Sequence, residues 1–181
     1  MSGPELVVLL DEAGAPAGSA LKSVVHGAST PLHLAFSCYL LDGAGRVLVT
    51  RRALSKQTWP GVWTNSFCGH PGPGEEAESA VRRRARDELG ASVGSIRVVL
   101  PRFRYRAVDA GGTEENEICP VFVARLESEV DPRPDEVADW AWVPPADLHE
   151  AVSRVPFVFS PWMREQLPLL HAAAAFAGRG A

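Results

Sequence analysis

One stretch of the chain, residues 63–90, constrains the fold and the chemistry more than any other. It contains a cysteine and a histidine two residues apart, Cys68 and His70, and continues into a spaced series of glycine, acidic and arginine positions. The series consists of Gly69, Glu75, Arg83, Asp87, Glu88 and Gly90. Five residues separate its first two positions and seven separate the next two. This spacing is that of a motif for binding a metal and a diphosphate.

The same stretch predicts a loop followed by a helix. Pro71-Gly72-Pro73-Gly74 is stiff and non-helical. From Glu75 onwards apolar residues recur at helical spacing, and Gly90 supplies a stop signal. Arg84 and Glu88 therefore lie one turn apart on one face of the predicted helix.

The composition indicates one soluble globular domain. The chain has 181 residues, of which 46% are hydrophobic and 22% are charged. We expect a single domain over residues 1–181, with a core over about 6–170 and a frayed tail over 172–181. No apolar run approaches the length of about 18 residues that a membrane-spanning helix needs. No positive side chain precedes the first apolar run, so we expect no signal peptide.

The charge and the cysteines restrict partners and location. A net charge of -4 gives no reason to expect nucleic acid or a membrane surface as a partner. Three cysteines without framework spacing favour a reducing compartment, and we expect the cytoplasm. We also expect a monomer.

Strands mixed with helices, without a regular βαβ rhythm, predict an α/β fold of the α+β kind, with a mixed sheet between helical layers. Strands are predicted at Leu6–Leu10, Leu32–Leu41, Arg46–Thr50, Ile96–Leu100, Phe103–Val108, Ile118–Leu126 and Trp140–Val143. Two further helices are predicted, from Pro144 to about Val152 and from about Ser160 to Phe176.

Three histidines and two glutamates are candidate metal ligands. They are His26, His33, His70, Glu115 and Glu117. Any one of these histidines alone is better explained as an ordinary hydrogen-bonded side chain, and an acidic pair before a strand is usually a solvated turn. Period-two geometry nevertheless puts Glu115 and Glu117 on the same side of the strand. Together the five would form a nitrogen and oxygen site suited to manganese, zinc or iron.

From about Leu6 to Met163 the chain resembles the type I isopentenyl-diphosphate isomerases of the Nudix superfamily. The resembling motifs are 32–37, 48–56, 59–66, 68–71, 103–107, 115–117 and 160–163. The series from Gly69 to Gly90 resembles the Nudix box, except that Arg84 and Asp87 stand where the box has glutamates. The resemblance implies a Nudix-type sheet between helices.

The resemblance also implies the reaction and its catalytic residues. Members of this family convert isopentenyl diphosphate to dimethylallyl diphosphate by adding and removing protons. Cys68 and Glu117 would transfer the protons, Tyr105 would position or relay one, and the ring of Trp162 would stabilise the carbocation. Whether the acid is Glu117, Tyr105 or Cys68 stays open.

The ligand set follows from the same resemblance. His26, His33, His70, Glu115 and Glu117 would hold manganese or zinc. Glu88, with the backbone carbonyl of Cys68, would bind a magnesium ion that arrives with the diphosphate. Lys22, Arg52, Lys56 and Arg84 would neutralise the diphosphate oxygens.

Two other functions remain as alternatives. A Nudix hydrolase would need the glutamate that Arg84 replaces, and would leave Cys68 and Trp162 without a role. A Nudix-fold binding module would be favoured if a catalytic residue were missing, but all four implied residues are present. The small residues between Gly14 and Ser29 also suggest the hypothesis of a lid that closes over the site.

Overall fold

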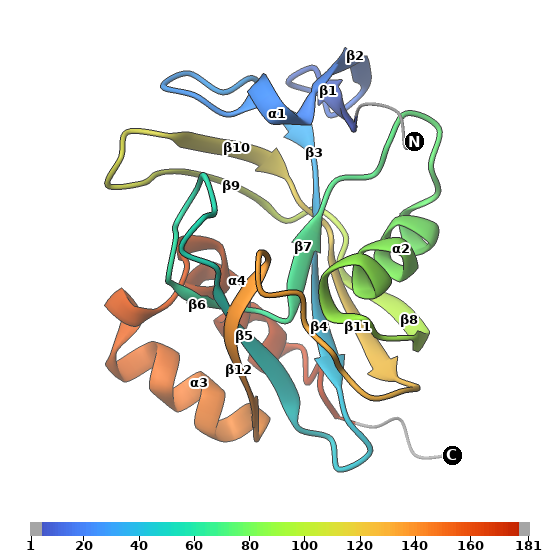
Figure 1. The fold of residues 1–181 in the computed structure, drawn as a ribbon, viewed down its shortest axis with the longest axis vertical. Helices are drawn as coiled ribbons and strands as arrows, with labels where there is room; N and C mark the ends of the chain where they lie inside the picture. The colour runs from blue at the N-terminus through green and yellow to red at the C-terminus, as the bar shows by residue number, and fades with distance from the viewer. Residues whose placement is uncertain (1–4, 178–181) are drawn as a thin grey trace.

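The computed structural model describes residues 5–177, and within them the strands form two sheets (Figure 1). The smaller sheet has the order β2-β1-β3-β10-β9. Its strands are β1 (Leu6–Leu10), β2 (Pro16–Leu21), β3 (His33–Leu34), β9 (Arg104–Val108) and β10 (Glu114–Ile118). The larger sheet has the order β12-β5-β4-β11-β8, and β6 and β7 pair with β5 and β4. Its strands are β4 (Phe36–Leu41), β5 (Val47–Arg52), β6 (Trp63–Thr64), β7 (Phe67–Gly69), β8 (Val93–Leu100), β11 (Val121–Leu126) and β12 (Val137–Val143).

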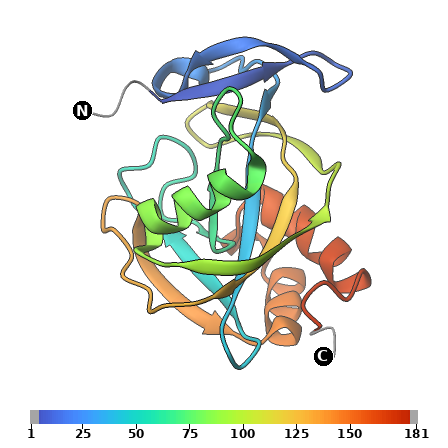
Figure 2. The same cartoon turned by 90° about the vertical axis from the view of Figure 1, so that its right-hand side faces the viewer.

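Three helices cover the two faces of the larger sheet. They are α2 (Ala77–Leu89), α3 (Pro145–Arg154) and α4 (Pro161–Ala172), with a 3-10 turn η1 (Pro156–Val158) before α4. The short helix α1 (Lys22–Val25) packs against β1 and β2 of the smaller sheet. Figure 2 shows α2 on one side of the sheet and α3 with α4 on the other. The helices of the described chain are all too short or too polar to cross a membrane.

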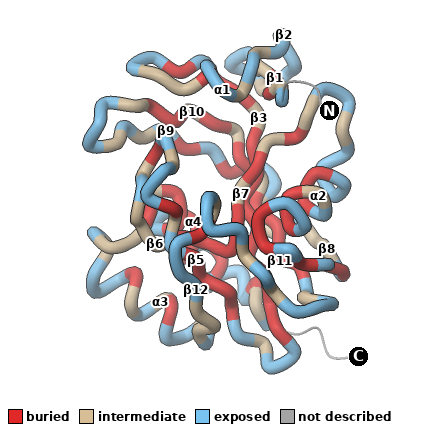
Figure 3. Tube along the Cα trace, viewed as in Figure 1, coloured by how far each residue is buried: buried red, intermediate tan, exposed pale blue. Residues whose placement is uncertain are grey.

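The strand β4 is buried over its whole length, and its alternate side chains build two separate cores (Figure 3). Tyr39 and Leu41 pack with residues of α3 and α4. Cys38 and Leu40 pack with residues of α2. Because successive side chains of a strand point to opposite faces, one buried strand anchors both helical layers.

Two segments of the chain pass side by side from the smaller sheet to the larger one. β3 leads into β4 through Ala35, and β10 leads into β11 through residues 119–120. The two crossings are hydrogen-bonded, since Ala35 N donates to Ile118 O at 3.0 Å. β3 and β10 run parallel, and His33 pairs with Glu117 in their register. The crossing therefore brings residues of both sheets to one place.

The sequence predicts most elements, with differences at the crossing and in the first thirty residues. The predicted strand Leu32–Leu41 is two strands, because the chain changes sheets at Ala35. The predicted strand Ile118–Leu126 starts at Val121 for the same reason. The strands β2, β6, β7 and β10 and the helix α1 were not predicted.

The expected frayed tail is corrected in its described part. α4 ends at Ala172 rather than at Phe176, but Ala175 is buried and the Phe176 ring lies 5.6 Å from that of Tyr39. These two apolar side chains cover the end of the core, while Ala173, Ala174 and Ala177 are exposed. Residues 178–181 lie outside the described residues.

Candidate active site

Four of the predicted metal ligands converge at the crossing between the sheets. They are His26 after α1, His33 on β3, His70 after β7 and Glu117 on β10, and their ligand atoms all lie within 4.8 Å of one another. His33 Nε2 lies 3.3 Å, and His70 Nε2 3.2 Å, from the same Glu117 oxygen, Oε1. The strand register explains the central contact, since Glu117 and His33 are paired residues.

The ring nitrogens of the histidines face the cluster. His33 Nδ1 lies 2.9 Å from the carbonyl oxygen of Pro31, which can only accept, so Nδ1 donates to it and Nε2 faces Glu117. Burial acts to lower the pKa of His33, but the contact with the Glu117 carboxylate outweighs it and raises that pKa. His26 Nε2 and His33 Nε2 are buried and have no hydrogen-bond partner. Burial also lowers the pKa of His70 to about 4, so this imidazole is neutral at neutral pH. Three imidazoles beside one carboxylate are a donor set that fits a transition-metal ion.

Glu115 borders this cluster and is not one of the four converging donors. One of its oxygens lies 3.3 Å from His26 Nε2. The same oxygen accepts a hydrogen bond from the Tyr105 hydroxyl at 3.5 Å. The paired residue of Tyr105 on the neighbouring strand is Glu117. The long tyrosine side chain reaches instead to the diagonal neighbour on β10.

The pKa values of the two buried carboxylates shift in opposite directions. Burial and the nearby charge of Glu117 raise the pKa of Glu115. Burial also acts to raise the pKa of Glu117, but His33 and His70 outweigh it and hold that pKa well below its usual range. Glu117 is therefore ionised in the folded protein.

Cys68, on β7, is a protonated thiol beside the cluster. Its Sγ donates to Asn65 Oδ1 at 3.4 Å and lies 3.5 Å from Ser37 Oγ. Burial raises the pKa of this thiol to about 11. It is therefore protonated at neutral pH rather than a reactive thiolate.

Asn65 connects Cys68 to Trp162, and the sequence analysis assigned it no role. Its Oδ1 also accepts from the Trp162 indole N–H at 2.8 Å and from Thr64 Oγ1 at 2.9 Å. Its amide nitrogen donates to the backbone carbonyls of Cys38 and Phe67 at 3.0 and 2.7 Å. The side chain is fully buried, so these bonds fix both the thiol and the indole.

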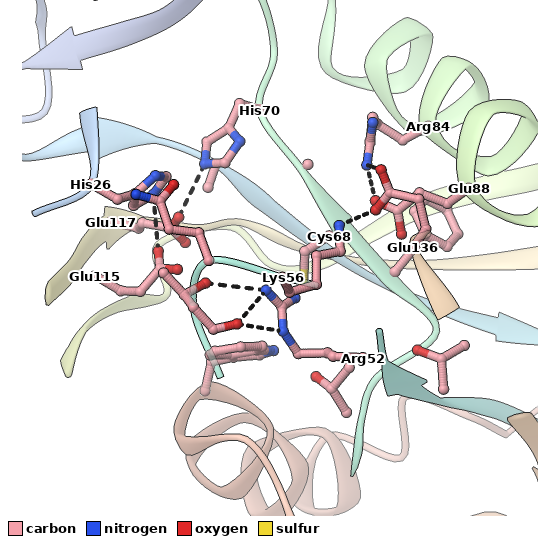
Figure 4. A pocket seen from close by; sticks show the side chains of 18 of the residues that line it. His26, Arg52, Lys56, Cys68, His70, Arg84, Glu88, Glu115, Glu117 and Glu136 are labelled. Carbon is pink, nitrogen blue, oxygen red and sulfur yellow. Dashed lines mark hydrogen bonds and ion pairs between the residues drawn. The ribbon is translucent and has the colours of Figure 1, made fainter. Parts of the chain in front are cut away.

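Four basic side chains gather on the other side of the cavity. They are Lys22, Arg52, Lys56 and Arg84, and together with Glu88 and Glu136 they line the same cavity as Cys68, Tyr105, Glu117 and Trp162. Its volume is about 170 Å³. Figure 4 shows Arg84, Glu88 and Glu136 on one side and His26, His70, Glu115 and Glu117 on the other, with Cys68 between them.

Each of these four basic groups already has a partner. Lys22 Nζ contacts Glu5 at 3.0 Å, and Arg84 is paired with Glu88 one turn along α2. Arg52 donates to the carbonyl oxygen of Thr58 at 3.0 and 2.8 Å. Lys56 is paired with Glu136, which the sequence did not reveal because nothing distinguishes it from the other acidic residues of its loop.

The spaced series from Gly69 to Gly90 contains both structural and cavity-lining residues. Arg83 makes two hydrogen bonds to Glu75 at 2.8 Å each and one to the His70 carbonyl oxygen at 3.1 Å, which braces the loop after β7. A Cβ on Gly69 would lie 2.6 Å from Arg84 Cγ, so only glycine lets the helix approach this closely.

The structure thus brings the predicted site residues together. All of them line the cavity except His33, which is fully buried behind it and belongs to the four-donor cluster.

Comparisons with known proteins agree with this arrangement. The NUDIX domain family matches residues 31–169. The isopentenyl-diphosphate Delta-isomerase of Paenarthrobacter aurescens is 59% identical over 97% of this chain and 95% of its own length. That of Agromyces mediolanus is 61% identical over 93% of this chain and 82% of its own length.

Solved structures share the fold at low identity. A Deinococcus radiodurans protein has a TM-score of 0.69 at 20% identity, covering 91% of this chain and 98% of its own. A MutT protein of Methanosarcina mazei has a TM-score of 0.61 at 18% identity, covering 80% and 96%. The chain therefore belongs to the NUDIX domain family and, within it, to the isopentenyl-diphosphate Delta-isomerases.

Proposed function

We propose that this protein converts isopentenyl diphosphate to dimethylallyl diphosphate in isoprenoid biosynthesis. The observation that carries the proposal is that a protonated thiol, Cys68, and an ionised carboxylate, Glu117, line one cavity together with an array of cations. Moving a carbon–carbon double bond needs one group that gives a proton and one that takes a proton, on two different carbons.

Cys68 and Glu117 form the proton-transfer pair. Before the reaction one of the two residues is protonated and the other is not. The protonated residue gives its proton to the alkene, and the other takes a proton from a different carbon, so the two exchange protonation states. Tyr105 is buried, and burial raises its pKa well above the usual value, so it keeps its proton. Its hydroxyl donates to Glu115, and Tyr105 is paired with Glu117 across β9 and β10. From this position Tyr105 relays a proton to the two carboxylates.

Trp162 stabilises the tertiary carbocation that protonation of the alkene creates. Its side chain is only 3% exposed, and Asn65 fixes its N–H. The ring already attracts a cation, since Arg52 Cζ lies 5.5 Å from the ring centroid. A desolvated cation–π contact is worth about 2 kcal/mol, or roughly thirtyfold in rate.

His26, His33, His70 and Glu117, with Glu115 as a fifth ligand, hold a manganese or zinc ion. When bound, this ion supplies positive charge that keeps Glu117 ionised and in place. Glu88 and the carbonyl oxygen of Cys68 receive the magnesium ion that accompanies the diphosphate.

The protein binds the diphosphate without hydrolysing it. Lys22, Arg52, Lys56 and Arg84 supply charge-assisted hydrogen bonds to its oxygens. Arg84 occupies the place of a metal-binding glutamate of the Nudix box, and a guanidinium cannot bind a metal or activate water against the phosphoanhydride. Binding one end of the substrate holds the alkene against Cys68 and Glu117.

The test is incubation of the protein with isopentenyl diphosphate and Mg²⁺, followed by separation of the products. Formation of dimethylallyl diphosphate without phosphate release is the expected result. Release of phosphate would identify a hydrolase, and binding without turnover would identify a binding module.

A further inference from the structure

Glu136 is an acidic residue at the basic side of the cavity, where an anionic substrate would bind. It lines the cavity, and its side chain is 19% exposed. Its Oε2 is paired with Lys56, and its Oε1 lies 3.7 Å from Arg84 Nη2. It therefore contacts two of the four cations proposed to hold the diphosphate.

The backbone holds Glu136 in this position. Its N–H donates to Arg133 O at 3.0 Å, and its carbonyl oxygen accepts from Ala53 N at 3.0 Å. The next residue, Val137, pairs with Arg52 in the register of β12 and β5. The backbone of Glu136 is thus fixed beside the loop that carries Lys56, and the two ion pairs hold its carboxylate there.

An incoming phosphate must share Lys56 and Arg84 with this carboxylate. A phosphate oxygen in contact with both cations would lie within about 6 Å of the Glu136 oxygens, because charge-assisted N–H···O contacts are about 2.8 Å long. At this separation in a partly buried site, two like charges repel strongly. A divalent cation on the diphosphate cancels most of its charge, and Glu88 stands beside Arg84 to receive that cation.

We propose that Glu136 is a specificity-determining residue that makes the site reject metal-free diphosphate and accept diphosphate only with Mg²⁺. The proposal rests on the proposed function, since it assumes that Lys56 and Arg84 bind the diphosphate. Glu136 acts by forming ion pairs with these two cations. A ligand without its own cation then gains too little binding free energy from Lys56 and Arg84.

The test is calorimetric binding of inorganic diphosphate to the whole protein, with Mg²⁺ and with a chelator, for the wild type and Glu136→Gln. The glutamine variant keeps the shape and removes the charge. We expect its affinity for metal-free diphosphate to rise by about tenfold or more, and its affinity for the Mg²⁺ complex to change little. The ratio of the two affinities is the readout, because a merely structural ion pair would change both alike.

Three further variants complete the design. Asp135→Asn removes the neighbouring exposed carboxylate, which pairs with Arg133, and is expected to leave the ratio unchanged. Glu136→Asp keeps the charge and should keep the wild-type ratio. Glu136→Ala removes the charge with a smaller side chain and replaces the glutamine variant if that one does not fold.

The outcomes separate the two claims. An unchanged ratio in the Glu136 variants that lack the charge, or weaker binding of both forms, would overturn the role of Glu136. A wild-type protein that binds no diphosphate even with Mg²⁺ would instead overturn the proposed diphosphate site.

Discussion

Asn65 and Trp162, 97 residues apart in the chain, are joined by a hydrogen bond of 2.8 Å from the indole N–H to the carboxamide oxygen. The same oxygen accepts from the Cys68 thiol. The ring proposed to stabilise a cation and the thiol proposed to move a proton are therefore positioned by a single buried side chain.

Replacing the indole should separate the role of the ring from that of its N–H. Trp162→Leu removes the aromatic face, so we expect kcat to fall roughly thirtyfold or more, while the affinity for Mg²⁺-diphosphate changes little. Trp162→Phe keeps a weaker π face and should retain more activity. Steady-state kinetics of both variants check this; equal losses in the two would contradict cation stabilisation by the ring.

Removing the thiol should stop the chemistry and spare binding. Cys68→Ala takes away one member of the proton-transfer pair, and we expect isomerisation to fall to background while calorimetry still detects Mg²⁺-diphosphate binding. Cys119→Ala is the control, because Cys119 is buried beside Ser37 and does not line the cavity. Near-normal turnover in Cys68→Ala would remove this residue from the mechanism.

The metal cluster predicts a joint loss of metal and activity. His70→Ala removes one of the four converging donors, so metal affinity should fall by about tenfold or more. Elemental analysis of the purified variant measures metal content, and His149→Ala is the control, because His149 lies on α3, outside the donor cluster and the cavity lining. A variant that is fully loaded and active would show that His70 is not a ligand.

Gly69 predicts a steric effect on Arg84. A methyl group there would lie 2.6 Å from Arg84 Cγ and 2.9 Å from the Phe36 ring, so Gly69→Ala should destabilise the protein by about 1–3 kcal/mol. Gly72→Ala is matched, since its Cβ would meet only Glu75 at an ordinary 3.7 Å. Thermal unfolding compares the two. Equal stabilities would mean that α2 can move away from β7 without a loss of folding free energy.

The brace between Glu75 and Arg83 predicts a pH dependence of stability. Hydrogen bonds from Arg83 lower the pKa of Glu75, with burial acting in the opposite direction. A lowered folded-state pKa means that the stabilisation is present above the unfolded pKa of about 4.3 and is lost as pH falls through the folded value.

Glu75→Gln should therefore be less stable than the wild type near neutral pH, and the difference should shrink as the pH falls from about 7 to about 3. Denaturant unfolding at a series of pH values measures it. A difference that is constant with pH would mean that the charge of Glu75 does not stabilise the fold.

Local patterns predicted the parts of the fold and site that depend on one element. The helical period placed Arg84 and Glu88 on one face, and both are buried on α2. The period of a strand placed Glu115 and Glu117 on one side, and both are buried on β10 while Asn116 is only partly so.

Tertiary contacts decided the rest. Nothing local marks Ala35 as the point where the chain changes sheets. Asn65 resembles any polar residue in a turn until Trp162 is placed beside it, and Glu136 is one acid among several until the pairing of β12 with β5 sets it against Lys56. The expected single domain, cytoplasmic location and monomeric state stay predictions.

The most direct test of the central claim is to run the reaction in D₂O and follow it by NMR. We expect isopentenyl diphosphate to become dimethylallyl diphosphate with solvent deuterium in a methyl group and with the diphosphate intact. We also expect no deuterium incorporation with Cys68→Ala or Glu117→Gln. Phosphate release without a change in the carbon skeleton, or full incorporation by either variant, would contradict the claim.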